Sequence, residues 1–206
     1  MEHQIKSEAA LRALMGEPIH PLVVAKSASV ITEPLKRYIE LSPFVCLGTH
    51  AANGACDLSP RGDPPGFVQV LDEKTLIIPE RPGNKRLDSV INIINQPNLS
   101  LLFLIPGVLE TVRVNGTGII TCDPDLLSRF PIKGKLPEIA IVVTVEEAFG
   151  HCSKAFRRSK LWASGNVPEL AVPTLAEMMS GHLQLDATTS AELEYGIADD
   201  AKNRMY

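Results

Sequence analysis

The sequence predicts an α+β fold in which six or seven mostly antiparallel strands form a β-barrel or sandwich with flanking helices. Short apolar stretches separated by turn residues recur from residue 44 to residue 148, as they do in proteins built from antiparallel strands. One helical pattern interrupts these strands between the fourth and the fifth, and the other helical patterns lie near the two ends of the chain. This segregation of helices from strands is typical of the α+β class.

The N-terminal part of the chain is predicted to form two helices. Residues 5–15 carry apolar side chains at helical spacing. Ser7, whose hydroxyl suits a helix N-cap, lies near the start of this pattern, and Gly16 ends it. A second helix is expected to begin around Pro34, because a proline in the first turn of a helix lacks an N–H that the helix does not need there.

Four short strands and a central helix are predicted next. The Asn53-Gly54 pair predicts a hairpin turn between the first two strands, since both residues tolerate positive φ. The strands are expected over 44–50, 55–60, 66–71 and 75–79. The central helix over 84–95 is expected to bury four residues at spacings of three and four, namely Leu87, Val90, Ile91 and Ile94.

Three longer strands are predicted after the central helix, over 99–105, 110–121 and 138–148. The first of them is almost continuously apolar, so we expect it to be buried on both faces. Gly116 and Gly118 permit a bend or a bulge in the second. Weaker helical patterns then make up a C-terminal helical tail.

The composition argues against several classes of function. The formal net charge is −4, whereas non-specific binding to nucleic acid needs a surplus of Lys and Arg. No stretch approaches the ~20 apolar residues of a membrane span, and the N-terminus lacks the apolar core of a signal peptide, so we expect a cytoplasmic protein. The four cysteines do not have the spacing of a metal site, and we predict none.

A basic turn at the end of the second strand is the first candidate for a binding site. Arg61 follows Ser59 there, and a guanidinium beside a hydroxyl suits a phosphate group. The local pattern also allows a solvated turn in which Arg61 pairs with Asp63.

A second basic turn opens the central helix. Asn84, Lys85 and Arg86 lie there after Gly83, and free N–H groups at a helix N-terminus attract anions. The local pattern equally allows a polar loop in which Asp88 pairs with Lys85 or Arg86 on an exposed face.

Two further residues are candidates with an open alternative. Thr111 and Arg113 share one face of their strand, which either meets a polar ligand or faces solvent. Trp162 is the only tryptophan and follows a basic segment over 151–160, so it either packs in a core or interface or stacks on a flat heteroaromatic ring.

Taken together, these stretches resemble the flavoproteins of the pyridoxamine 5'-phosphate oxidase-related superfamily, and among them a bacterial subgroup of FMN-binding proteins. The resemblance covers roughly residues 5–165 and needs several motifs in sequence order, because each alone is weak. The stretches that carry it are Ser59–Asp63, Gly66–Val68, Pro79–Asp88, Asn92-Ile93, Pro106-Gly107, Glu110–Gly116, His151–Ala155 and Arg158–Trp162.

The resemblance implies an FMN-binding split β-barrel with a two-part phosphate site. Arg61, Lys85 and Arg86 would neutralise the FMN phosphate, while Ser59 and Asn84 would add hydrogen bonds. The implied domains are a helical arm over 1–42, the FMN-binding barrel over 43–165 and a helical tail over 166–206.

The resemblance also implies where the flavin ring and a second subunit lie. Ile78, Pro79 and Glu80 would run along the isoalloxazine ring, and Thr111 would lie near it. In such proteins the flavin lies in a homodimer interface. The residues that would reach the flavin of the other subunit are Lys154, Arg158, Ser159 and Trp162.

Three functional hypotheses follow from the resemblance. The first is an FMN-dependent oxidoreductase that uses a reduced nicotinamide or a small organic substrate, with no side chain required as a catalytic acid or base because the flavin carries the chemistry. The second is a non-catalytic flavin-binding or carrier protein. The third is a barrel that binds another phosphorylated ligand, such as a partner of haem-breakdown intermediates or a deazaflavin cofactor. The C-terminal substrate-binding motif of the true pyridoxamine phosphate oxidases has no counterpart here, which argues against vitamin B6 oxidation.

Overall fold

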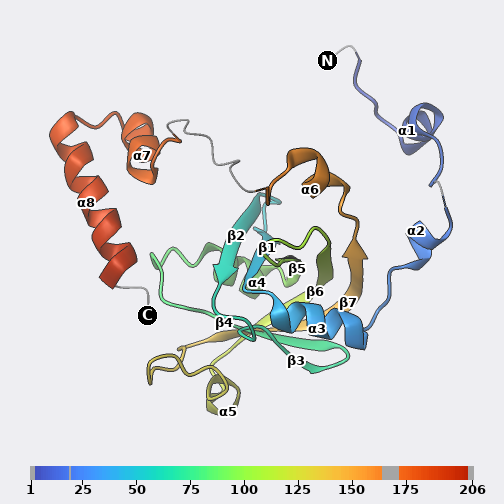
Figure 1. Cartoon of the computed structure of the whole chain (residues 1–206), viewed down its shortest axis with the longest axis horizontal. Coiled ribbons are helices and arrows are strands. Elements are labelled where there is room, and N and C mark those ends of the chain that lie inside the picture. The colour runs from blue at the N-terminus through green and yellow to red at the C-terminus, as the bar shows by residue number, and fades with distance from the viewer. Residues whose placement is uncertain (1–2, 19, 164–171, 204–206) are drawn as a thin grey trace.

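The fold is a single curved sheet of seven strands with helices against it, as the computed structural model in Figure 1 shows. The structure describes residues 3–18, 20–163 and 172–203. The strand order is β2-β1-β5-β6-β7-β4-β3, and every neighbouring pair is antiparallel. The predicted α+β fold with six or seven mostly antiparallel strands is therefore confirmed.

The strands begin and end close to the predicted positions. They are β1 (Phe44–His50), β2 (Cys56–Gly62), β3 (Gln69–Asp72), β4 (Thr75–Pro79), β5 (Asn98–Leu104), β6 (Thr111–Thr121) and β7 (Ala140–His151). The register of β6 with β7 shifts between Asn115 and Gly116, at the predicted glycine, but the extra residue of the bulge is Glu146 on β7 and not a residue of β6. A side chain at Gly116 would overlap the Thr144 carbonyl, which explains the glycine.

Eight helices lie in the described part of the chain, and α3 (Glu33–Leu41) and α4 (Asp88–Asn95) pack on the sheet. α4 packs on β1, β2 and β6, while α3 packs on β3, β6 and β7. None of the described helices is long and apolar enough to cross a membrane. The helices are α1 (Glu8–Met15), α2 (Leu22–Ala25), α3 (Glu33–Leu41), α4 (Asp88–Asn95), α5 (Pro124–Leu127), α6 (Lys154–Ser159), α7 (Leu175–Leu183) and α8 (Ala187–Asn203).

The prediction for the buried face of the central helix was wrong in part. Val90 is buried as expected, but the exposed fractions of Leu87, Ile91 and Ile94 are 44%, 49% and 68%. The helix begins at Asp88, and the residues that it buries against the sheet are Ser89, Val90 and Ile93.

The prediction that the fifth strand is buried on both faces was also wrong. Burial alternates along β5: Leu99, Leu101 and Phe103 are buried, whereas Ser100 is exposed and Leu102 is half-buried. The strand belongs to an antiparallel sheet whose core packs against one face, and such strands alternate.

The hydrophobic core joins the strands to α3 and α4. Its largest fully buried side chains include Ile39, Leu47 and Phe103. The boundary predicted between residues 165 and 166 lies outside the described residues, and the division into arm, barrel and tail stays a prediction.

Candidate functional site

The loop before α4 has an unusual backbone. Lys85 and Leu87 adopt left-handed conformations, with φ of 59° and 57°, and each such residue costs about 1–2 kcal/mol unless its surroundings compensate. Leu87 is the N-cap residue of α4 and makes no side-chain capping hydrogen bond. The first N–H groups of the helix are therefore not satisfied by the cap, and they carry the partial positive charge of a helix N-terminus.

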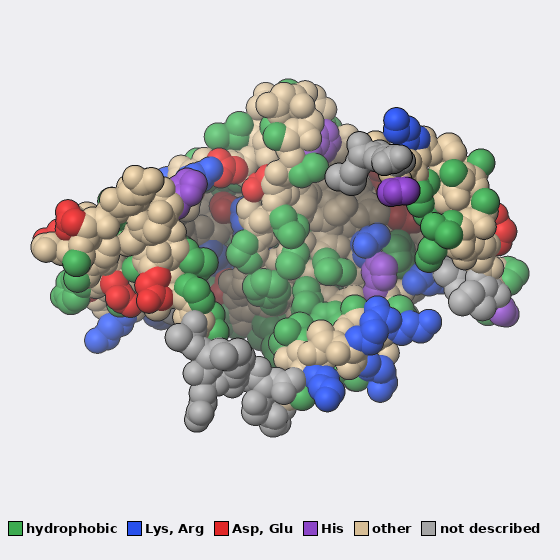
Figure 2. Space-filling model, turned by 90° about the horizontal axis from the view of Figure 1, so that it is seen from above, with side chains coloured by type: hydrophobic (Ala, Val, Ile, Leu, Met, Phe, Trp, Pro, Cys, Tyr) green, Lys and Arg blue, Asp and Glu red, His purple; other side chains and the backbone are tan. Residues whose placement is uncertain are grey.

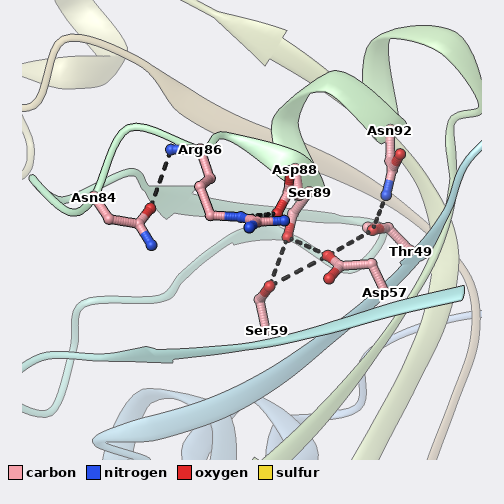
Figure 3. A network of polar contacts seen from close by, with 8 residues as sticks. All are labelled: Thr49, Asp57, Ser59, Asn84, Arg86, Asp88, Ser89 and Asn92. Atoms are coloured by element: carbon pink, nitrogen blue, oxygen red, sulfur yellow. Dashed lines mark hydrogen bonds and ion pairs between the residues drawn. The ribbon is translucent and has the colours of Figure 1, made fainter. Parts of the chain in front are cut away.

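A cluster of hydroxyls and one carboxylate lies beside this helix end (Figure 3). Asp57 Oδ2 accepts a hydrogen bond from Ser89 Oγ at 2.9 Å, from Ser59 Oγ at 3.2 Å and from Thr49 Oγ1 at 3.4 Å. Asn92 Nδ2 donates to Thr49 Oγ1 at 3.1 Å. The cluster thus connects α4 to β1 and β2.

Of this cluster, only Ser59 was expected from the sequence. Ser89 is 2% exposed, and Asp57 and Ser59 are half-buried. Asp57, Ser59 and Arg61 alternate along β2 and share its more covered face. That alternation was the available signal for Asp57, whereas nothing in the local pattern brings Ser89 to β2.

Arg86 lies at the exposed rim of the cluster. Its Nε lies 2.7 Å from Asp88 Oδ2, and the exposed fractions of the two side chains are 73% and 45%. The hydrogen bond and the charge of Asp88 raise the pKa of the Arg86 guanidinium, and the Asp57 carboxylate adds a smaller contribution. The Arg86 N–H donates to Asn84 Oδ1 at 3.0 Å. Lys85 is exposed.

Arg61 connects β2 to the end of β4. Its Nε lies 3.0 Å from Glu80 Oε2, and the exposed fractions of these side chains are 17% and 16%. Asp63, the alternative partner considered above, pairs with Arg81 Nε at 2.7 Å. The pair of Arg61 and Glu80 brings one predicted phosphate ligand next to the predicted ring-binding segment.

The segment Ile78–Glu80 lies at the end of β4, where β3 no longer pairs with it. Ile78 and Pro79 are buried, and the Glu80 N–H donates to the Ile139 carbonyl at 3.0 Å. On the other side of β4, the ladder with β3 reaches only as far as Ile77, which lies opposite Gln69. β3 therefore does not pair with the backbone beyond Ile77.

Thr111 lies in a different part of the molecule. β6 pairs Thr111 with His151 and Thr121 with Ala140, and Ala140 pairs in turn with Pro79. Thr111 and the Ile78–Glu80 segment are therefore near opposite ends of β6, and one chain does not bring them together.

A mainly apolar cavity of about 470 Å³ adjoins Thr111, which is buried. Tyr38, Glu110 and His151 also line it. The His151 Nε2 atom is buried without a hydrogen-bond partner. Burial lowers the pKa of His151, and the charges of Arg113 and Lys26 lower it further, which favours the neutral imidazole.

The remaining predicted residues belong to α6 and the turn after it. Lys154, Arg158 and Ser159 are exposed. Trp162 Nε1 donates to the Val108 carbonyl at 2.9 Å, and its ring stacks on Phe156 at 5.8 Å between centroids. In Figure 2, Lys and Arg side chains gather on the part of the upper face where α6 lies in Figure 1.

The predicted residues thus fall into two groups within one chain. Ser59, Arg61, Glu80, Asn84 and Arg86 line the region between β2, β4 and the start of α4. Thr111 and the α6 residues lie elsewhere. Among the described residues, no three His, Cys, Asp or Glu side chains are placed to hold a metal ion.

Comparison with known proteins gives one matching family and several distantly similar solved structures. Residues 31–152 match the family described as pyridoxamine 5'-phosphate oxidase. No curated protein sequence matches the chain significantly.

Three solved structures illustrate the distant similarity. HupZ of Group A Streptococcus is 21% identical over 58% of this chain and 93% of its own, with a TM-score of 0.49. A Lactobacillus delbrueckii protein is 23% identical over 59% of this chain and 95% of its own, with a TM-score of 0.46. An FMN-binding protein of Syntrophomonas wolfei is 11% identical over 64% of this chain and 91% of its own, with a TM-score of 0.46.

Proposed function

The chain belongs to the pyridoxamine 5'-phosphate oxidase family, and from this premise we propose that it is an FMN-binding flavoprotein that acts as an oxidoreductase. The observation that carries the proposal is the uncapped start of α4, which lies beside the Ser59 and Ser89 hydroxyls and the exposed Arg86 guanidinium. Backbone N–H groups, hydroxyls and a guanidinium are the donors that phosphate-binding sites use.

The residues of this region fit a flavin phosphate. Arg86 is mostly exposed, so its guanidinium can exchange the Asp88 carboxylate for a phosphate oxygen without burying an unpaired charge. Lys85 is exposed beside it, and Asn84 already bonds the loop backbone. In this proposal Arg61, whose side chain is 17% exposed and pairs with Glu80, holds the second side of the phosphate.

The open edge of β4 suits the flavin ring in the same proposal. Ile78 and Pro79 are buried and fix the position of the backbone, and the ladder with β3 stops at Ile77. The backbone beyond that point would face the polar edge of the ring. FMN supplies hydride or electron transfer when it is bound, while the chain binds it, orients it and shields it from water.

The second group of residues leads us to propose a homodimer. Thr111 and the α6 residues Lys154, Arg158 and Ser159 lie apart from the phosphate region of their own chain. In a dimer with the flavin between subunits, these residues and Trp162 would complete the site of the partner. The substrate would be a small organic molecule or a reduced nicotinamide.

A visible absorption spectrum tests the proposal directly. The purified protein, alone and after addition of FMN, is expected to have bands near ~370 and ~450 nm, typical of an oxidised flavin cofactor. Bleaching of the longer-wavelength band by NADH or NADPH would support an oxidoreductase, and failure of any donor to bleach it would favour a flavin carrier. A colourless protein that does not take up FMN would contradict the proposal.

A further inference from the structure

A negatively charged side chain, Asp57, lies within the proposed phosphate site. Asp57 is on β2, two residues from Ser59 and four from Arg61, on the same face of the strand. One of its oxygens accepts hydrogen bonds from the hydroxyls of Thr49, Ser59 and Ser89 (Figure 3). A phosphate bound at the start of α4 would meet this carboxylate.

The hydroxyls cannot serve both acceptors. A serine hydroxyl has one proton to donate, and the Ser59 hydroxyl donates its proton to Asp57 at 3.2 Å. Ser89 Oγ lies 2.9 Å from Asp57 Oδ2 and 3.1 Å from Ser59 Oγ, so its proton is also directed into the cluster. A phosphate oxygen next to these hydroxyls would meet lone pairs instead of donors, unless a hydroxyl rotated away from Asp57.

The carboxylate is also held in place. Asn92 Nδ2 donates to Thr49 Oγ1 at 3.1 Å, and Thr49 Oγ1 lies 3.4 Å from Asp57 Oδ2. Contacts from α4, β1 and β2 therefore converge on it. Asp57 further contributes to the electrostatic environment of Arg86, so its charge is felt by the cation that we assign to the phosphate.

We propose that Asp57 is a specificity-determining residue that competes with the phosphate for the Ser59 and Ser89 hydroxyls and thereby weakens binding of the phosphorylated flavin relative to the flavin without phosphate. This inference rests on the proposed function. It names the molecular feature that the site discriminates: the charge on the tail of the flavin. Both flavins have the same ring, so the Asp57 carboxylate weakens the binding of the phosphorylated flavin and not that of the flavin without phosphate.

The test is the Asp57→Asn variant, which keeps the size of the side chain and one acceptor oxygen but removes the charge. Binding of FMN and of riboflavin is measured by quenching of flavin fluorescence, with the native protein alongside. We expect FMN to bind about tenfold more tightly to the variant, as expected when a like charge is removed from beside an anion. Riboflavin affinity is expected to stay within about twofold of the native value.

Two controls separate charge from structure. Glu146 is an exposed acid on β7, and Glu146→Gln changes the net charge equally, so it should leave both affinities unchanged. Melting curves establish that each variant is folded. If Asp57→Asn does not fold, Asp57→Thr removes the charge with a residue that suits a strand.

The outcomes distinguish this inference from the proposed function. If the variant binds FMN no more tightly than the native protein, or if both flavins shift by the same factor, Asp57 only fastens α4 to the sheet and the inference is wrong. If the native protein and every variant bind neither flavin, the proposed function fails, and the inference fails with it.

Discussion

Arg81 and Arg86 both lie in the loop between β4 and α4, and each has a carboxylate oxygen 2.7 Å from its Nε. The first ion pair is buried, whereas the second is exposed to solvent. The exposed fractions are 16% for Arg81 and 1% for Asp63, against 73% for Arg86 and 45% for Asp88. Arg81 also donates from Nη1 to the Phe130 carbonyl at 3.0 Å. The two ion pairs therefore have the same length, but separating the charges costs much more free energy in the buried pair than in the exposed one.

The difference assigns separate roles to two residues of the same type. Water cannot readily replace Arg81 beside the buried Asp63 carboxylate, because removing one partner of a buried ion pair is strongly destabilising. Water or a ligand can replace Asp88 beside Arg86, since an exposed pair contributes little and exchanges freely. We therefore regard Arg81 as a structural residue and Arg86 as a residue that can bind a ligand.

The largest expected effect is on stability, from Arg81→Ala. Removing the guanidinium leaves Asp63 buried without this partner, which typically lowers the free energy of unfolding by about 3–5 kcal/mol. Urea denaturation followed by circular dichroism measures the change. Arg129→Ala, at an exposed arginine near Phe130, is the matched control and should have a small effect. Equal midpoints for the two variants would mean that the pair of Arg81 and Asp63 is not structural.

The contrast between these arginines also indicates what the sequence could not predict. Both lie in the same basic turn, so a local pattern treats them alike. Arg81 is separated from the others by contacts with Asp63 and Phe130, which lie 18 and 49 residues away along the chain. Burial of this kind depends on how segments that are distant in the sequence pack together, and a local sequence pattern does not reveal it.

The fold was easier to predict than the site because its signals are local. Alternating apolar residues and turn residues predicted the strands, and Gly116 marked the point along β6 at which the register with β7 shifts. The start of α4 was missed because Lys85 and Leu87 adopt left-handed conformations that their residue types disfavour. The contact of Ser89 with Asp57 was missed because it joins residues 32 positions apart.

The next effect is on ligand binding, from Arg86→Ala. If Arg86 binds the phosphate, FMN affinity should fall by about 10- to 100-fold, on the scale of a charge-assisted hydrogen bond. The melting temperature should hardly change, because the exposed pair with Asp88 contributes little to stability. Fluorescence titration at low and high salt measures the affinity, and the native protein should lose more affinity with salt than the variant does.

Arg37→Ala is the control for this experiment, because Arg37 is an exposed arginine on α3 and has no role in the proposed site. The control should bind FMN as the native protein does. Unchanged FMN affinity in Arg86→Ala would remove Arg86 from the site, and the contrast with Arg81 would then be one of burial alone.

The smallest expected effect comes from Asp88→Asn, which tests whether Arg86 is free to change partners. In the native protein the guanidinium must leave Asp88 Oδ2 before it meets a phosphate, and the neutral amide holds it less strongly. FMN affinity should therefore rise by about two- to threefold, less than for Asp57→Asn, because exposed charges are screened by water and salt. Riboflavin titration is the control and should give the same affinity in both proteins. Weaker FMN binding in Asp88→Asn would mean that Asp88 orients Arg86 toward the phosphate, so that both arginines of the loop would depend on a fixed carboxylate partner.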